Sequence, residues 1–412
     1  MFNLHYMKKT REFDIIIWGA TGFTGRLVAN YLFKKYGINE DLKWAMAGRN
    51  LDKLKLIRSE VANENVSLIV ADSNDEVSLD DLTKRTSVIC TTVGPYAKYG
   101  SKLVDACVEN QTHYCDLAGE IQWIRKVIDK HHESAKSNGT KIVNCCGFDS
   151  IPSDMGVYFI QNDARNKNIK IAKHIEMRVA GVSGGISGGT YESLSQVNAE
   201  AYKDKDVFKV LINPYGLNPI GDQKGLDSYD LRSVVYDNSS KNWIAPFLMA
   251  AINTKIVRRS NALNEYSYGN DFKYDEATLC GKGFSGRIKG IINTIPLGIM
   301  MSAKPGSIIK KIVDKILPKA GEGPDKDKRE NGFYNLRFYI TYEDGSKDIA
   351  KVIGDMDPGY GSTSKMLGEA AVCLAKDQLS DVSGVLTPSV AMGDKLLIRL
   401  KNNAGLSFSF KD

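Results

Sequence analysis

Short apolar runs alternate along the first 150 residues with segments whose apolar side chains recur at helical spacing. The runs that we interpret as strands lie at 15–18, 43–47, 66–71, 88–93, 112–115 and 141–145. Strands that are apolar along their whole length and separated by helices are typical of a parallel sheet covered on both faces. The pattern therefore predicts an α/β fold with an open, doubly wound parallel sheet over residues 1–150.

The pattern changes beyond residue 150, where strands and helices no longer alternate regularly. We expect a strand at 173–180, a hairpin at 333–342 and 348–353, and helices at 362–376 and through residue 400. This mixture predicts a second, mixed α+β substrate domain over 151–383, which contains a basic apolar segment at 243–319. A C-terminal helix and strand follow at 384–412, and we leave open that they pack back on the first domain.

A glycine-spaced turn, Gly19-Ala20-Thr21-Gly22-Phe23-Thr24-Gly25, joins the first predicted strand to the first helix. Glycine permits a tight turn and a close approach of the backbone to a pyrophosphate, which then meets the N-terminus of the helix. The spacing is Gly-x-x-Gly-x-x-Gly and not Gly-x-Gly-x-x-Gly, so the turn is slightly longer. The turn predicts a Rossmann-type dinucleotide site, with Gly19, Thr21, Gly22, Phe23, Thr24 and Gly25 as cofactor residues.

The end of the second strand distinguishes NADP(H) from NAD(H), because a carboxylate there accepts from a free ribose hydroxyl whereas a cation neutralises the 2′-phosphate. No carboxylate follows this strand, which ends in Gly48-Arg49-Asn50. The Arg49 guanidinium has the planar geometry that binds phosphate, Asn50 can donate a hydrogen bond, and Lys53 lies one helical turn further on. We therefore predict that the cofactor is NADP(H).

Ligands of doubly wound sheets collect beyond the carboxyl ends of the strands. This topology places Asp72 near the adenine of the cofactor, and it places Thr92, Gly94 and Pro95 further along, toward the nicotinamide. All four residues are therefore predicted to lie beside the cofactor.

Hydride transfer also requires a group that donates a proton near the nicotinamide. Tyr96 follows the Gly94-Pro95 turn and is our first candidate for this catalytic role. Asp149 and Ser150, beyond a neighbouring strand, are the second candidates. The alternative, in which Tyr96 stacks on the cofactor or packs a domain interface, stays open.

Composition restricts the chemistry and the compartment. The chain has 412 residues, 7 cysteines and 5 histidines. The histidines show no metal-ligand spacing, so we expect no metal. The cysteines have no Cys-x-x-Cys pair and resemble small buried hydrophobes in a reducing, cytoplasmic environment. Charges in the first 13 residues are not followed by a long apolar run, so no secretory signal is expected.

Positive charge is concentrated in one apolar segment. Residues 282–319 hold eight cations and one acid, Asp314, whereas the whole chain carries a net charge of +6. Apolar residues at helical spacing, followed by Pro318, predict a basic amphipathic helix over 308–317. The apolar stretches of 243–319 are too short to cross a bilayer. We leave open an interfacial helix, a lid over a lipidic substrate, or an ordinary surface helix, and we expect no nucleic-acid binding because no reading module is present.

The motifs together carry a resemblance to a known family. They include 19–25, Ala47-Gly48-Arg49-Asn50, Thr92-Val93-Gly94-Pro95-Tyr96, 113–120, 146–154, Asp357-Pro358-Gly359-Tyr360 and 384–388. The chain resembles the saccharopine dehydrogenase-like oxidoreductases, and among them the trans-acting enoyl reductases. The resemblance implies an NADP-binding Rossmann domain, a mixed substrate domain and reduction of a carbon–carbon double bond in a lipid or polyketide precursor. It supplies no settled catalytic residue.

Two other functions stay open. A carbonyl or imine reductase of the saccharopine type would need an anion site for an amino-acid carboxylate, at 187–190 or at Arg258-Arg259. The other alternative is a non-catalytic, NADP-bound lipid-binding protein associated with membranes. The apolar residues of 243–317 favour a small-molecule lipidic acyl substrate, with peripheral membrane contact. A homodimer is left open as the assembly.

Overall fold

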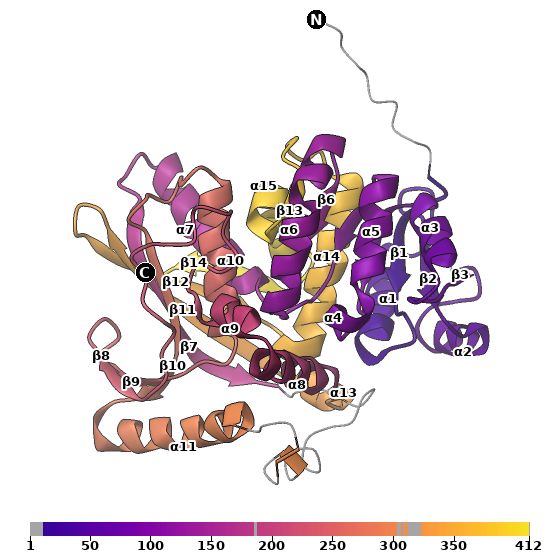
Figure 1. Cartoon of the computed structure of the whole chain (residues 1–412). Helices are drawn as coiled ribbons and strands as arrows, with labels where there is room; N and C mark the ends of the chain where they lie inside the picture. The colour runs from indigo at the N-terminus through magenta and orange to yellow at the C-terminus, as the bar shows by residue number, and fades with distance from the viewer. Residues whose placement is uncertain (1–10, 185–187, 303–305, 308–309, 312–322, 412) are drawn as a thin grey trace, which may run out of the picture.

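Two seven-stranded sheets stand side by side in the protein, with α14 (Thr363–Lys376) between them (Figure 1). The computed structural model describes residues 11–184, 188–302, 306–307, 310–311 and 323–411. The first sheet is entirely parallel, in the order β13-β6-β5-β4-β1-β2-β3. Its strands are β1 (Phe13–Trp18), β2 (Trp44–Gly48), β3 (Ser67–Val70), β4 (Thr86–Thr91), β5 (His113–Cys115), β6 (Lys141–Val143) and β13 (Gly384–Leu386). The predicted doubly wound fold is confirmed.

Helices cover both faces of the first sheet, which explains why its strands are continuously apolar. Ile15 and Ile17 of β1 pack on one face, whereas Ile16 and Trp18 pack on the other. The first face carries α1 (Phe23–Tyr36), α2 (Leu51–Val61) and α14, and the second carries α3 (Glu76–Lys84), α5 (Ser101–Asn110) and α6 (Ile121–Asn138). A four-residue helix, α4 (Tyr96–Tyr99), precedes α5 at the carboxyl edge of the sheet. Every side chain of β1 except that of Asp14 is thereby buried.

The second sheet is mixed, in the order β14-β12-β11-β7-β10-β9-β8, with β7 and β10 parallel and the other pairs antiparallel. Its strands are β7 (Ala172–Ser183), β8 (Val235–Asp237), β9 (Asn242–Ala245), β10 (Lys273–Gly281), β11 (Phe333–Tyr342), β12 (Lys347–Gly354) and β14 (Leu406–Phe410). The remaining helices are α7 (Ile151–Asn166), α8 (Gly188–Lys203), α9 (Lys205–Ile212), α10 (Ala250–Leu263), α11 (Gly283–Ser302), α13 (Lys326–Glu330), α15 (Pro388–Asn402) and a π-helical turn, η1 (Pro358–Ser362). The predicted hairpin is β11–β12.

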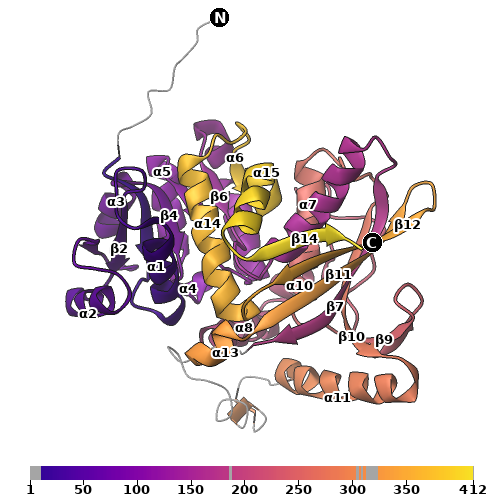
Figure 2. The same cartoon turned by 180° about the vertical axis from the view of Figure 1, so that it is seen from behind.

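The C-terminal part of the chain contributes to both sheets. β13 pairs with β6 at one edge of the first sheet, and β14 pairs with β12 in the second. Between the sheets, α14 packs on β1, β4 and β5, as Figure 2 shows from behind. The domain boundaries at residues 150 and 383 stay predictions. The first layer nevertheless includes α14, whose residues fall in the range predicted for the second domain.

Two predicted features lie partly or wholly outside the described residues. The basic helix predicted at 308–317 is one, because only residues 310 and 311 of it are described. The glycine loop predicted as an anion site at 187–190 is the other, since residue 187 and the side chains of 188–190 are not described. Among the described helices, none combines the length and the apolar content needed to cross a membrane.

Candidate functional site

The glycine turn forms a narrow backbone cradle at the carboxyl end of β1. Gly19 has a φ of +87°, a conformation that L side chains rarely adopt. A Cβ on Gly25 would lie 2.1 Å from the Gly19 carbonyl oxygen and 2.8 Å from Oγ1 of Thr92. Helix α1 starts at Phe23 with Gly22 as its N-cap, with no side-chain cap and no acidic residue in its first turn. The first N–H groups of the helix are therefore available to a phosphate, so the turn fits a dinucleotide.

The ring of Phe23 connects the glycine turn to the second half of the chain. It lies edge-on to Tyr360 of η1, with ring centroids 5.1 Å apart, and the Arg329 guanidinium lies 5.5 Å from its centroid. A Cβ on Gly323 would lie 2.5 Å from the same ring. Phe23 can therefore serve a cofactor through its backbone N–H, whereas its side chain packs against protein. Thr21 and Thr24 are half-buried in the same turn.

The cations predicted to bind a 2′-phosphate are free to do so. Arg49 and Lys53 are exposed, and neither forms an ion pair with any residue that the structure describes. The Asn50 side chain accepts from the backbone N–H of Lys53 at 2.9 Å and so caps α2, a role that we did not predict. Asp72 lies beyond β3 and accepts from the N–H of Asn74 at 2.8 Å, which holds its carboxylate in a local turn.

Glu120 is a buried carboxylate that holds α4 and α8 together at the carboxyl edge of the first sheet. We did not predict a role for it from the sequence. It accepts from the backbone N–H groups of Tyr96 and Ala97, each at 2.8 Å, and from the hydroxyl of Ser193 in α8, also at 2.8 Å. Burial raises the pKa of Glu120. Glu120 therefore positions α4 and attaches α8 to it. The signal in the sequence was the carboxylate of the last residue of the motif 113–120, which begins with β5.

The Gly94–Pro95 turn lies between β4 and α4, and Pro95 is the N-cap residue of α4. A Cβ on Gly94 would lie 3.6 Å from Oγ of Ser193, so α8 faces this turn. The side chain of Thr92 donates to the Gly19 carbonyl at 3.3 Å. Thr92 therefore lies beside the glycine turn and Gly94 lies beside α8, and contact of either residue with the cofactor stays a prediction.

Tyr96 points into the protein. Its hydroxyl donates to the Thr91 carbonyl at 3.4 Å and accepts from the Leu117 N–H at 3.3 Å. Its ring stacks on Trp123, with centroids 5.4 Å apart, and only 5% of the residue is exposed. Burial raises the pKa of Tyr96 well above its usual value. This geometry favours the packing alternative for Tyr96 over proton donation.

Asp149 has the properties of a proton donor. It follows β6, and its carboxylate lies beside Gly119, where a Cβ would be 3.4 Å from Oδ2. No described residue donates a hydrogen bond to this carboxylate, and burial raises its pKa to about 7. The neighbouring Ser150 hydroxyl is fully buried and also has no partner among the described residues. Thr363 fixes the loop, since its hydroxyl accepts from the Phe148 N–H at 2.9 Å.

Asp116, which follows β5, is a structural carboxylate and differs from Asp149 in its hydrogen bonds. It accepts from the Tyr114 hydroxyl at 2.9 Å and the Asn144 amide at 2.7 Å. It also accepts from the N–H groups of Ala118 at 2.9 Å and Cys145 at 3.0 Å. Four donors leave it no free lone pair for a substrate, so Asp116 ties the ends of β5 and β6 together.

Arg258-Arg259, one of the two anion sites considered for the saccharopine-type alternative, is not available to a ligand. Both side chains are buried, and the Arg258 Nε donates to Asp227 at 2.5 Å. Arg259 donates to the carbonyls of Leu217, at 2.5 Å, and Val385, at 2.7 Å. Their donors are used inside the protein, where they join α10 to its neighbours.

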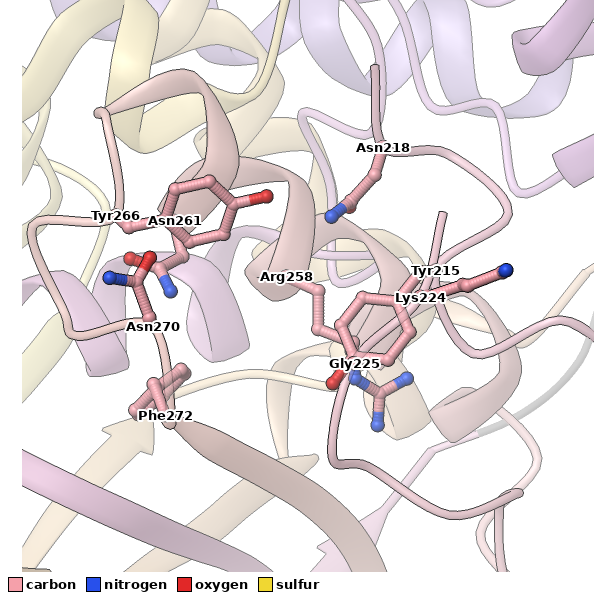
Figure 3. Close-up of a pocket in the computed structure, with 9 residues that line it drawn as sticks. All are labelled: Tyr215, Asn218, Lys224, Gly225, Arg258, Asn261, Tyr266, Asn270 and Phe272. Atoms are coloured by element: carbon pink, nitrogen blue, oxygen red, sulfur yellow. The ribbon is translucent and has the colours of Figure 1, made fainter. Parts of the chain in front are cut away.

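A small pocket beside Arg258 supports the same conclusion. In Figure 3 the Tyr215 ring lies over the Arg258 guanidinium. The distance from Cζ of Arg258 to the centroid of this ring is 5.4 Å. The cavity measures about 30 Å³, which is room for one or two water molecules. It is too small for an acyl chain or an amino acid.

Among the described residues, His174, Glu176 and Asp275 bring potential metal ligands together, with ligand atoms within 4.8 Å of one another. The Arg178 guanidinium already occupies the place of a cation, since it lies 2.5 Å from Asp275 and 3.1 Å from Glu176. The cluster therefore has its charge balanced by the protein itself.

The cradle, the free cations beyond β2 and the unpaired carboxylate beyond β6 lie along the carboxyl edge of one parallel sheet. They define the class of NADP(H)-dependent oxidoreductases with a Rossmann-type domain. Residues 15–143 match the family model described as the saccharopine dehydrogenase NADP binding domain. The predicted cofactor is thus confirmed.

Curated relatives identify the family. A Mycobacterium tuberculosis (strain H37Rv) protein, named provisionally as a trans-acting enoyl reductase, is 38% identical over 95% of this chain and 96% of its own length. A trans-acting enoyl reductase of Mycobacterium ulcerans is 34% identical over the same shares. The chain belongs to the family of trans-acting enoyl reductases, which confirms the resemblance seen in the motifs.

The fold comparison agrees. An apo saccharopine dehydrogenase (L-Glu forming) from Saccharomyces cerevisiae matches with a TM-score of 0.53, over 97% of this chain and 99% of that chain, at 12% identity. At this identity the likeness shows the shared fold alone. The chain is an NADP(H)-dependent oxidoreductase of the enoyl reductase type.

Proposed function

We propose that the protein reduces the carbon–carbon double bond of a lipid or polyketide acyl substrate, with Asp149 as the proton donor. The observation that carries this proposal is a half-buried carboxylate at the cofactor edge that has no hydrogen-bond partner among the described residues and whose pKa is raised to about 7. An acid with such a pKa is protonated in a useful fraction of molecules at neutral pH. The names of the relatives support the choice of a double bond as the reacting group.

The chain's own residues divide the work in the following way. The glycine turn with Arg49 and Lys53 holds the nucleotide, and Glu120 holds the segment that begins with α4. When bound, NADPH supplies the hydride for the β carbon of an enoyl thioester. Asp149 protonates the α carbon and recovers its proton from water. The product carries two more hydrogens than the substrate, one from the hydride of NADPH and one from the proton of Asp149.

The test is NADPH oxidation measured against enoyl thioesters of increasing chain length, and against keto acids with and without an amine. We expect turnover on the enoyl thioesters. Turnover on keto or imino acids alone would replace this proposal with the saccharopine type of reaction, for which Arg258 and Arg259 offer no free carboxylate site. NADPH binding without turnover on any substrate would indicate the non-catalytic function.

We further propose that the substrate is lipidic, and that the protein meets it as a cytoplasmic protein in peripheral contact with a membrane. Large apolar side chains exposed along α11 support this proposal. Rates that rise with acyl chain length, and rise further when the substrate is presented in vesicles, are the expected result. Equal rates for short, freely soluble thioesters would contradict it.

A further inference from the structure

Helix α11 lies flat on β9 and β10 because its inner face is made of glycine. A Cβ on Gly286 would lie 2.2 Å from the Gly281 carbonyl oxygen, and one on Gly290 would lie 2.8 Å from Cγ1 of Val234. Both glycines are buried, one turn apart. With the glycine face against the sheet, the large side chains of the helix are directed away from the protein.

Those large side chains form one continuous apolar surface, which we call the α11 stripe. Its members recur at intervals of one, three or four residues, as expected for a single helix face, and each is between 41% and 76% exposed. They are Phe284, Ile288, Ile291, Ile292, Ile295 and Ile299. A monomer rarely leaves so many large aliphatic groups in contact with water on one element.

The charge around the stripe has one sign. Helix α11 contains no aspartate or glutamate, and Lys282, Arg287 and Lys289 at its start are all exposed. The sequence from 282 to 319 contains eight cations and one acid. Apolar side chains on one face with flanking lysine and arginine are typical of helices that lie in the interface of an anionic membrane.

We propose that the α11 stripe docks the protein on the surface of an anionic phospholipid membrane. The isoleucines would lie in the acyl boundary, and the cations would meet the lipid headgroups. A lipid surface fits better than a protein partner, because the stripe is mostly aliphatic and contains a single aromatic residue, whereas protein interfaces are enriched in aromatic residues.

The position of α11 connects docking to the active site. In both views α11 lies along the lower edge of the molecule, on the same side as α8 and α13 (Figures 1 and 2). The Ser193 hydroxyl in α8 binds Glu120 at the cofactor edge, and α13 carries Arg329 over the Phe23 ring. Docking through α11 would therefore bring α8 and α13, which contact the cofactor edge, close to the membrane. This inference rests on the proposed function, because a lipidic substrate is the reason for the enzyme to bind a membrane.

The test measures flotation of the full chain with vesicles of phosphatidylcholine alone, or with 30% phosphatidylglycerol (about one lipid in three), in the absence of nucleotide. We expect binding to the anionic vesicles that weakens at high salt. The double variant Ile292→Asp/Ile295→Asp should lower the partition coefficient at least tenfold. Arg287→Glu/Lys289→Glu should lower it on anionic vesicles only. The matched controls, Leu56→Asp and Lys34→Glu/Lys35→Glu, change exposed residues elsewhere and should bind like the wild type.

Absence of vesicle binding by the wild type, or unchanged binding by the Ile292→Asp/Ile295→Asp variant, would overturn the inference. A dimer in sedimentation experiments that this variant dissociates, without any vesicle binding, would also overturn it and assign the stripe to a second copy of the chain. Turnover of soluble enoyl thioesters is measured on the same samples. Turnover without vesicle binding refutes the docking alone, whereas vesicle binding without turnover refutes only the proposed enzyme activity.

Discussion

Replacing Asp149 with asparagine separates its role in catalysis from its effect on stability, because the substitution should lower kcat and raise the melting temperature. Burial raises the pKa of this carboxyl from 3.8 to about 7. A shift of about three units corresponds to about 4 kcal/mol, since one unit is about 1.4 kcal/mol. The side chain keeps partial solvent contact, which reduces our expectation to about 2 kcal/mol.

The sign follows from proton linkage. The folded protein binds the Asp149 proton more tightly than the unfolded chain does, so the carboxyl lowers the free energy of unfolding as pH rises from about 4 to about 7. Above pH 7 the full penalty is present. Asp149→Asn should therefore raise the melting temperature at pH 8 by a few degrees, and by about half as much at pH 5.5. The wild-type kcat should fall above pH 7 as the donor loses its proton.

The assay combines calorimetric melting curves with kcat on an enoyl thioester across pH 5.5–9. Asp149→Asn should lower kcat by about 100-fold or more and remove the alkaline decline. Asp116→Asn is the matched control, because the carboxylate of Asp116 accepts hydrogen bonds from four donors. The NH₂ group of the new amide cannot accept from these donors, so this variant should have a lower melting temperature. The reasoning would be refuted by an Asp149→Asn enzyme that keeps its kcat and its alkaline decline.

Three further substitutions test the rest of the site. Arg49→Asp should weaken NADPH binding in calorimetry by about 10- to 100-fold and leave NADH binding unchanged, whereas the control Lys55→Asp, an exposed residue of α2, should change neither. Equal losses for both nucleotides would contradict the 2′-phosphate assignment. Gly25→Ala should weaken binding of both nucleotides by about 100-fold or more, because its Cβ would meet the Gly19 carbonyl, while Gly298→Ala has open space and should bind normally. Tyr96→Phe should keep kcat within about threefold, and a loss of about 100-fold would restore Tyr96 as the proton donor.

The first sheet was predictable because its information is local. Strands buried on both faces, such as β1, are apolar throughout, and the turn at 19–25 needs glycine for reasons that act within a few residues. The predicted strand positions of this sheet therefore agree closely with the structure. The exposure of Arg49 and Lys53 agrees with the role that the sequence suggests for them, and their contact with a 2′-phosphate stays a prediction.

Other features depend on segments far apart in the sequence. β13 joins β6 across some 240 residues, and nothing within Gly384–Leu386 specifies this neighbour. The exposure of a charged side chain is equally non-local, so the arginine pair at 258–259 looked like a surface anion site although α10 is buried. Glu120 acquires its role only when α8 supplies the Ser193 hydroxyl. Residue type predicted possible chemistry, and the packing decided which groups were free to perform it.

The supply of hydrogen-bond donors explains why one carboxylate at this edge is suited to catalysis. Asp116 and Glu120 follow β5, Asp149 follows the neighbouring strand β6, and burial raises the pKa of each. The first two accept four and three hydrogen bonds, which stabilise the charged form and occupy the oxygens. Asp149 accepts none from the described residues, so its proton stays available at neutral pH. A half-buried acid without a hydrogen-bond partner costs stability, and a role as proton donor to the substrate gives a physical reason for keeping it.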